Sequence, residues 1–240
     1  MTLREQLIVV IGGTSGIGRA VAEGALREGA AVIVASSSAA KIEAARTALP
    51  AADGRKVDVR NEESLRDFFA GVGAFDHLVF TAGDWGPARG MTLDALDRAA
   101  AESLFAVRFW GAVAAAKHAV HHLRKTGSIT LTDGMVAHRP RKGTAVSTAM
   151  AGAIEHLTRG LAAELAPIRV NAVCPGAIRT DVWNAIPVDA REERMRAMTK
   201  HLPIARVGEP QEAAEAYLYL MRGGYTTGQI LRVDGDGSLV

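Results

Sequence analysis

A cluster of glycines near the start of the chain has the spacing needed to bind a phosphate group. It follows the apolar run Leu7–Ile11 and reads Gly12-Gly13-Thr14-Ser15-Gly16-Ile17-Gly18. Glycines at 12, 16 and 18 permit a tight turn and let backbone amides approach a pyrophosphate, and the helix expected to start there adds partial positive charge. The alternative is an ordinary strand-to-helix turn, but strand, loop, helix and next strand come in the order of a dinucleotide-binding unit.

The charge of the residues at the end of the second predicted strand distinguishes a dinucleotide with a 2′-phosphate from one without. A carboxylate there would bond a free ribose 2′-hydroxyl and repel a 2′-phosphate. The strand ends instead in the neutral donors Ser36, Ser37 and Ser38, and Lys41 and Arg19 add positive charge. A serine-rich helix start that caps its own amides is the alternative. The sequence therefore predicts NADP(H) in preference to NAD(H).

The elements that position these residues alternate regularly along the chain. Short β-branched runs alternate with longer Ala- and Leu-rich stretches, which is typical of parallel strands joined by crossover helices. No linker or repeat interrupts the pattern, so we expect one α/β domain over residues 1–240, a Rossmann-type doubly wound parallel sheet of seven strands with helices on both faces. The predicted strands are Leu7–Ile11, Ala31–Ala35, Arg55–Val59, His77–Thr81, Ser128–Thr132, Arg169–Cys174 and Gln229–Val233.

Two segments between these strands have further significance. Apolar residues recur at helical spacing from Val146 to Leu161, which predicts a helix that buries one stripe. The least regular segment is 177–206, before the helix expected near Pro210, and its position suits a substrate lid.

The glycine spacing resembles that of the short-chain dehydrogenase/reductase family, and the resemblance covers essentially the whole chain. Asp58-Val59 is similar to the family's adenine-binding pair, and Thr81-Ala82-Gly83 to its Asn-Ala-Gly turn. Pro175-Gly176 lies in a segment similar to the one that closes over the nicotinamide. The resemblance implies a homotetramer or dimer through two long helices, and a cofactor site of Gly12, Thr14, Ser15, Gly16, Ile17, Gly18, Ser36, Ser37, Ser38, Lys41, Asp58, Val59, Thr81, Ala82, Gly83, Pro175, Gly176, Ile178 and Thr180.

The resemblance fails at the residues that transfer a proton. Redox members of the family carry an Asn, a Ser and a Tyr-x-x-x-Lys motif. Alignment through the downstream segment 161–165 places Val146 and Met150 at the Tyr and Lys positions, and neither can transfer a proton. The Asn and Ser positions hold Arg108 and Asp133. Because the family places its Asn and Ser on either side of the Tyr-Lys pair, the resemblance implies that the two are neighbours over the nicotinamide pocket. Their opposite charges suit such a pair, as catalytic residues or as a structural salt bridge.

Other polar and aromatic residues near these positions are weaker candidates. His138, Arg139, Arg141 and Lys142 are interpreted as an exposed loop, of which only His138 has a pKa useful for acid/base work. Residues 84–87, Trp110 and Trp183 could line a substrate mouth, although tryptophans more often pack. The tyrosines Tyr217, Tyr219 and Tyr225 are interpreted as packing residues.

Composition excludes several classes of partner. The 28 basic and 26 acidic side chains leave a net charge of +2, too weak for a nucleic-acid footprint. The apolar run after the first residues is too short for a signal or a membrane span, so we expect no membrane partner. Cys174 is the single cysteine, which suits a cytoplasmic protein without disulfides, and no metal site is expected.

Two functions remain open from the sequence. The first is an NADP(H)-dependent oxidoreductase acting on a small-molecule carbonyl or alcohol, with its proton from Asp133, Arg108, a loop histidine or water. The second is a non-redox cofactor-binding protein or cyclase-like enzyme that keeps the dinucleotide site.

Overall fold

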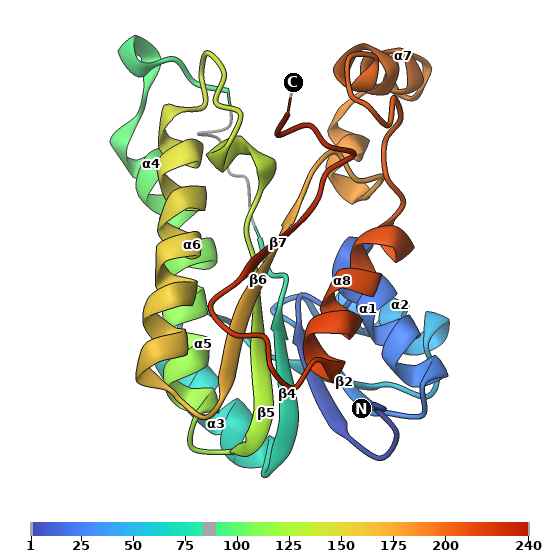
Figure 1. Ribbon diagram of the computed structural model, residues 1–240, viewed down its shortest axis with the longest axis vertical. Coiled ribbons are helices and arrows are strands. Elements are labelled where there is room, and N and C mark those ends of the chain that lie inside the picture. Colours follow the sequence, from blue (N-terminus) through green and yellow to red (C-terminus); the bar gives the residue numbers. More distant parts are fainter. Residues whose placement is uncertain (1, 84–89, 240) are drawn as a thin grey trace.

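The computed structural model describes residues 2–83 and 90–239, and its centre is one parallel sheet of seven strands (Figure 1). The strand order β3-β2-β1-β4-β5-β6-β7 reverses direction between β1 and β4, as in a doubly wound fold. This confirms the predicted fold class. The strands are β1 (Leu7–Ile11), β2 (Ala31–Ser36), β3 (Asp53–Lys56), β4 (Phe75–Phe80), β5 (Leu123–Thr132), β6 (Arg169–Pro175) and β7 (Ile230–Val233).

All seven predicted strands are present, but the third begins two residues earlier and ends three residues earlier than predicted. The β3 strand pairs with β2 from Ile33↔Asp53 to Ser36↔Lys56, so its residues are mostly polar. Because β3 lies at the edge of the sheet, its pairing rather than its hydrophobicity defines it. The apolar Val57 and Val59, on which the prediction depended, lie after the strand.

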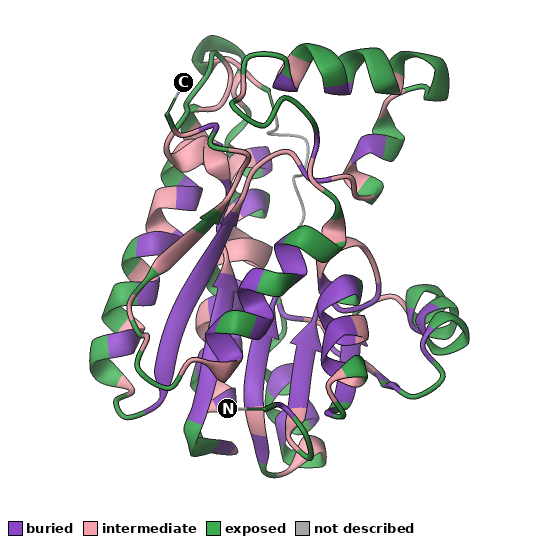
Figure 2. Ribbon diagram, turned by 45° about the vertical axis from the view of Figure 1, so that its right-hand side comes forward, coloured by how far each residue is buried: buried purple, intermediate pink, exposed green. Residues whose placement is uncertain are grey.

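Helices cover both faces of the sheet and enclose two apolar cores. One face carries α1 (Gly16–Arg27), α2 (Ala39–Ala48) and α8 (Pro210–Arg222); the other carries α3 (Glu62–Val72), α4 (Arg98–Phe105), α5 (Gly111–Ala119) and α6 (Ala145–Glu164). The strands are buried along most of their length, whereas the helices expose their outer faces (Figure 2). This arrangement leaves the carboxyl ends of the strands as the edge where polar side chains can meet.

The helices α4 and α5 form one continuous rod through a π-helical turn, Ala106–Trp110. The rod, Arg98–Ala119, is apolar and long enough at 22 residues to cross a membrane by length and composition alone. Packing explains the apolar character of the rod, because its residues Ala112, Ala115 and Ala119 are buried in the core. Arg108 lies in the π-helical turn, a kind of irregularity that often marks functional sites.

The segment 177–206 is more regular than the sequence indicated. It contains a short 3-10 helix, Asp181–Ala185, and the helix α7 (Val188–Thr199), which lies beyond the carboxyl ends of the strands (Figure 1). The helix was missed because its exposed, highly charged sequence has almost no apolar stripe. A small separate cluster of Trp183, Met195 and Val207 holds the segment together.

Candidate functional site

The glycine loop is pressed against the end of β4, where only glycine fits. Gly12 has φ +92°, and a Cβ on it would lie 2.5 Å from the amide nitrogen of Ala82. A Cβ on Gly18 would overlap the carbonyl oxygen of Gly12 and the hydroxyl of Thr81. The loop therefore packs as closely against the end of β4 as its backbone allows, and helix α1 begins within it at Gly16.

The start of α1 offers backbone amides to a ligand. Ser15 is the N-cap residue but its side chain makes no capping hydrogen bond, and the first turn carries no acidic residue. Thr180 lies opposite, 3.2 Å from where a Cβ on Gly16 would stand. Because free amides at a helix N-terminus bind phosphate, this end of α1 fits a pyrophosphate.

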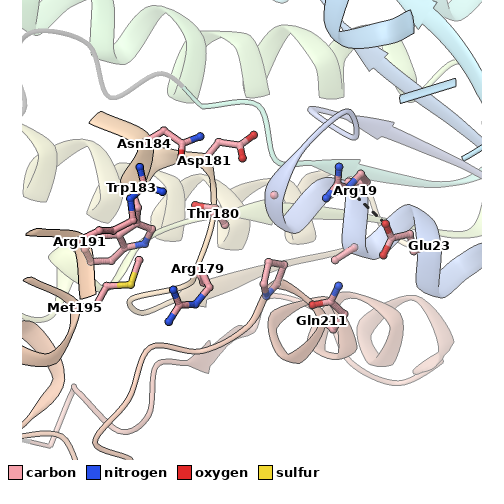
Figure 3. Close-up of a pocket in the computed structure, with 13 residues that line it drawn as sticks. Arg19, Glu23, Arg179, Thr180, Asp181, Trp183, Asn184, Arg191, Met195 and Gln211 are labelled. Carbon is pink, nitrogen blue, oxygen red and sulfur yellow. Dashed lines mark ion pairs between the residues drawn. The ribbon is translucent and has the colours of Figure 1, made fainter. Parts of the chain in front are cut away.

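A cavity of about 240 Å³ opens between these two segments (Figure 3). Arg19 and Glu23 line it from α1, and Thr180, Asp181 and Asn184 line it from the segment after β6. Arg19 Nε lies 3.5 Å from Glu23 Oε1, and the side chain of Arg19 is the more exposed of the two. The structure thus brings together the glycine loop and Thr180, which are more than 160 residues apart in sequence.

The serines after β2 divide between two roles. Ser38 is the N-cap of α2 and accepts a hydrogen bond from the Lys41 amide at 3.3 Å, so the helix-capping alternative holds for this residue. The Ser36 hydroxyl accepts from the Ser38 amide, also at 3.3 Å. The Lys41 side chain belongs to an exposed residue near the end of β2. No carboxylate follows β2 until Glu43, and the preference for a 2′-phosphate stays a prediction.

Asp58 and Val59 lie in the turn after β3. The Asp58 carboxylate accepts hydrogen bonds from the backbone and guanidinium of Arg60, and this pairing lowers the pKa of Asp58 below its usual value. The Val59 side chain packs against the backbone of Gly111 at the start of α5. The adenine-binding role of this pair stays a prediction.

Arg108 reaches from the π-helical turn to the end of β4. Its guanidinium lies against the backbone of Gly83, directly after Thr81 and Ala82. The Arg108 guanidinium therefore lies one residue away from Thr81 and Ala82, whose backbone packs against the glycine loop. An arginine keeps its charge at any working pH, so it can stabilise developing negative charge but cannot act as an acid.

Asp133 lies in a buried group of polar side chains at the ends of β5 and β6. It is 3% exposed, and its backbone amide donates to the Val173 carbonyl at 2.9 Å. Burial and the nearby Glu155 carboxylate raise the pKa of Asp133 to about 8. Burial and the same carboxylates also raise the pKa of the Cys174 thiol far above its usual value. His138 completes the group, with Nε2 2.6 Å from Oε1 of Glu155.

The predicted proximity of Arg108 and Asp133 stays a prediction. The causes that set the pKa of Asp133 are burial, Glu155, Gly134 and Cys174. Both charges act on the phenol of Tyr217, which is fully buried and 2.8 Å from the Thr132 hydroxyl. Tyr217 thus packs as predicted. Tyr219 is exposed because it lies on the outer face of α8, and Tyr225 is exposed in the turn that follows this helix.

Val146 and Met150 lie on the face of α6 that packs on the sheet. Met150 is buried in the apolar core, and Val146 is partly buried against it. The neighbouring Ser147 hydroxyl donates to the Thr144 carbonyl. The absence of the family's proton-transfer residues, which depends on the alignment, stays a prediction.

Several other candidates occupy unexpected environments. His138 is not on an exposed loop, because a short 3-10 helix turns it inward onto α6. Trp183 is buried and donates to the Ile178 carbonyl at 2.7 Å, whereas Trp110 is 62% exposed. Residues 84–87 lie outside the described residues.

Sequence reasoning missed Glu155, although it lies within the predicted helix. Glu155 follows Ile154 in a stripe of core residues, and a helical wheel alone would place it at the edge of the apolar face. A signal was present, because Ser147, Ala151 and Thr158 share its face at spacings of three and four residues. Small residues on that face indicate a close approach to the sheet, which buries Glu155.

Comparisons with known proteins identify the family to which the chain is similar. The family model described as enoyl-(acyl carrier protein) reductase matches residues 12–236. Short-chain dehydrogenase/reductase ATR9 of Stachybotrys chlorohalonatus is 36% identical, with 99% of each chain covered, and carbonyl reductase family member 4 of Danio rerio is 34% identical, with 98% and 99% covered.

Solved structures show the same similarity. A small-chain dehydrogenase in complex with NADPH has a TM-score of 0.84 at 36% identity, covering 98% of this chain and 100% of the other. The MalC reductase/Diels-Alderase of Malbranchea aurantiaca has a TM-score of 0.89 at 33% identity, covering 99% and 97%. With the fold, the glycine loop and these matches in agreement, the chain belongs to the short-chain dehydrogenase/reductase family.

Proposed function

We propose that the chain is an NADP(H)-dependent oxidoreductase acting on a carbonyl or alcohol group of a small molecule. The observation that carries this is the cradle formed by Gly12, Gly18 and the uncapped start of α1, which a single added Cβ would fill. The similarity to a dehydrogenase in complex with NADPH supports the choice of ligand. When bound, the cofactor supplies the hydride, and the protein supplies binding, orientation and charge stabilisation.

The residues proposed to hold the cofactor come from the ends of five strands. The amides of Ser15, Gly16 and Ile17 would bind the pyrophosphate, with Arg19 beside them. The Ser36–Ser38 turn and Lys41 would bind the 2′-phosphate through neutral donors and positive charge. The remaining proposed contacts lie where β3, β4 and β6 end: Asp58, Val59, Thr81, Ala82, Gly83, Pro175, Gly176, Ile178 and Thr180.

Arg108 is the proposed catalytic residue for charge stabilisation. Its guanidinium beside Gly83 would face the alkoxide that forms when a carbonyl is reduced, a contact that strengthens as charge develops. Asp133 is the other residue that the sequence analysis proposed for catalysis, but both of its carboxylate oxygens are enclosed. We therefore assign Asp133 a positioning role at the end of β5. Because arginine stays charged and His138 is turned onto Glu155, a water molecule would supply the proton.

A non-redox reaction is the second candidate. The observation that favours it is the TM-score of 0.89 to a protein described as both a reductase and a Diels-Alderase. The two candidates make different predictions for a panel of carbonyl compounds. A redox enzyme consumes NADPH above background with at least one of them, whereas a non-redox protein binds NADPH and consumes none.

We expect NADPH to bind more tightly than NADH, and Ser36→Asp to weaken NADPH binding by about 1–3 kcal/mol. The variant places a carboxylate next to the proposed 2′-phosphate site and removes one hydroxyl contact. Calorimetry with both cofactors measures the change. Thr47→Asp, which adds the same charge at the far end of α2, is the matched control and should leave NADPH binding unchanged. Equal or tighter binding of NADH by the wild-type protein would contradict the proposal.

We expect Arg108→Met to lower kcat about 100-fold or more, because a preorganised charged donor is worth that much at a developing oxyanion. NADPH affinity should stay within about twofold, as the residue is proposed to act on the substrate. Arg98→Gln, on the exposed side of the same rod, is the control. A well-folded Arg108→Met protein with unchanged kcat would remove Arg108 from the mechanism.

A further inference from the structure

Four side chains with metal-binding atoms converge behind the proposed active site. They come from four separate segments: Asp133 after β5, His138 after the 3-10 helix Met135–Ala137, Glu155 on α6, and Cys174 on β6. One ligand atom from each lies within 4.8 Å of the corresponding atom of every other. The group thus combines two carboxylates, one imidazole and one thiol in a single small volume.

The polar atoms of this group lack the partners that burial normally demands. Both carboxylate oxygens of Asp133 and Oε1 of Glu155 are buried without a hydrogen bond within the described residues. His138 Nε2 approaches Glu155 Oε1 to 2.6 Å, but the angles are not those of a hydrogen bond. Only 3% of the Asp133 surface is exposed, and its carboxylate oxygens point into the cluster. Buried carboxylates without partners are costly, and a bound cation is one way that proteins satisfy them.

We propose that Asp133, His138, Glu155 and Cys174 form a four-coordinate site for a divalent transition metal of the Zn²⁺ type. Zinc takes carboxylate oxygen and imidazole nitrogen at about 2.0–2.2 Å and thiolate sulfur at about 2.3 Å, so tetrahedral ligand atoms lie roughly 3.5 Å apart. To reach that geometry, separations of up to 4.8 Å would have to shorten, and the 2.6 Å between His138 Nε2 and Glu155 Oε1 would have to widen. Magnesium and calcium are disfavoured, because they require six or more ligands, nearly all oxygen.

Charge and access also suit a metal at this place. A divalent cation would displace the protons of the Asp133 carboxyl and the Cys174 thiol, because metal ligands bind in their deprotonated form. Two carboxylates and one thiolate around the cation then leave one negative charge, and the guanidinium of Arg159 lies 3.7 Å from Glu155 Oε2 to balance it. The His138 side chain keeps 23% of its surface exposed, so the cluster can be reached from the loop after β5. Four protein ligands fill a tetrahedron, so the site would be structural and would tie β5, β6 and α6 together. The inference does not depend on the proposed redox function.

The test uses the full-length protein, treated with chelator and then titrated with Co²⁺ or Zn²⁺. We expect one equivalent of Co²⁺ to bind, with the visible bands of four-coordinate cobalt and a near-ultraviolet thiolate-to-cobalt band. One equivalent of Zn²⁺ should displace it and raise the Tm. Cys174→Ala should lose the thiolate band and weaken binding at least tenfold. His138→Gln, which changes the more exposed side of the cluster, should weaken metal binding by a similar factor. This variant tests the site even if Cys174→Ala fails to fold.

The control is His156→Gln, which removes the exposed histidine next to Glu155 on α6 and should leave metal binding unchanged. Absence of stoichiometric binding at micromolar metal would overturn the proposal. So would a cobalt spectrum that is identical in the wild-type and Cys174→Ala proteins, or binding that depends on His156. None of these measurements uses catalytic activity, so they leave the proposed oxidoreductase function to its own tests.

Discussion

Gly18→Ala is expected to weaken NADPH binding more than 100-fold and to destabilise the protein by about 1–3 kcal/mol. The added Cβ would overlap the Gly12 carbonyl and the Thr81 hydroxyl, and the first of these is backbone that cannot rotate away. Relief therefore requires α1 to move away from the loop. That movement would displace the Ser15 and Gly16 amides proposed to bind the pyrophosphate, and binding to such a cradle depends on their positions.

The control for this prediction is Gly152→Ala on α6. A Cβ on Gly152 meets nothing within 4 Å, so the substitution should leave NADPH binding unchanged and stabilise the helix by about 0.5–1 kcal/mol. Calorimetry with NADPH and urea denaturation measure both quantities. A folded Gly18→Ala protein that binds NADPH within threefold of the wild type would show that the cofactor does not use this loop.

Lowering the pH from about 7 to below 4 is expected to remove about 3 kcal/mol of stability through His77 alone. His77 is a buried residue of β4, which lies between β1 and β5 in the sheet. Its Nε2 lies 2.9 Å from Gln6 Oε1 and its Nδ1 lies 2.8 Å from the Ser128 hydroxyl. A neutral imidazole can satisfy both contacts by donating to Gln6 and accepting from Ser128. Burial, with the nearby positive charge of Arg169, lowers the pKa of His77 from 6.5 to about 4.

The sign of the effect follows from the direction of this shift. Because the folded-state pKa of His77 lies below the unfolded value, the unfolded chain binds more protons between pH 6.5 and 4. The contribution is therefore complete above about pH 6.5 and is lost as the pH falls through 4. The shift of roughly 2.5 pKa units corresponds to about 3 kcal/mol at 1.36 kcal/mol per unit.

The measurement is urea denaturation of the wild-type and His77→Gln proteins at several pH values. The variant should be less stable at pH 7 but should lose less stability on acidification, so the two curves converge toward pH 4. His156→Gln, which removes an exposed histidine, should follow the wild-type curve. Parallel curves for the wild type and His77→Gln would mean that His77 is not held in its neutral form.

Some features of the chain were determined by local sequence. The glycine loop was recognisable because a tight turn between strand and helix needs glycines at fixed positions, and Gly12 adopts the positive φ expected of one. The strands in the interior of the sheet were recognisable because burial on both faces requires continuous apolar runs. Ser38 could be assigned two roles, and the structure places it as a helix cap.

Other features depended on the tertiary structure, because they join segments far apart in the chain. The polar edge strand β3 is defined by its pairing with β2, which local hydrophobicity does not report. Helix α7 has too few apolar residues to show a stripe. Hydrophobic periodicity predicts which face of an element is buried, but not which polar side chains meet behind that face. The sequence by itself therefore determined the fold and the glycine loop, whereas only the packing of α6 on β5 and β6 brought Asp133, His138, Glu155 and Cys174 into one buried cluster.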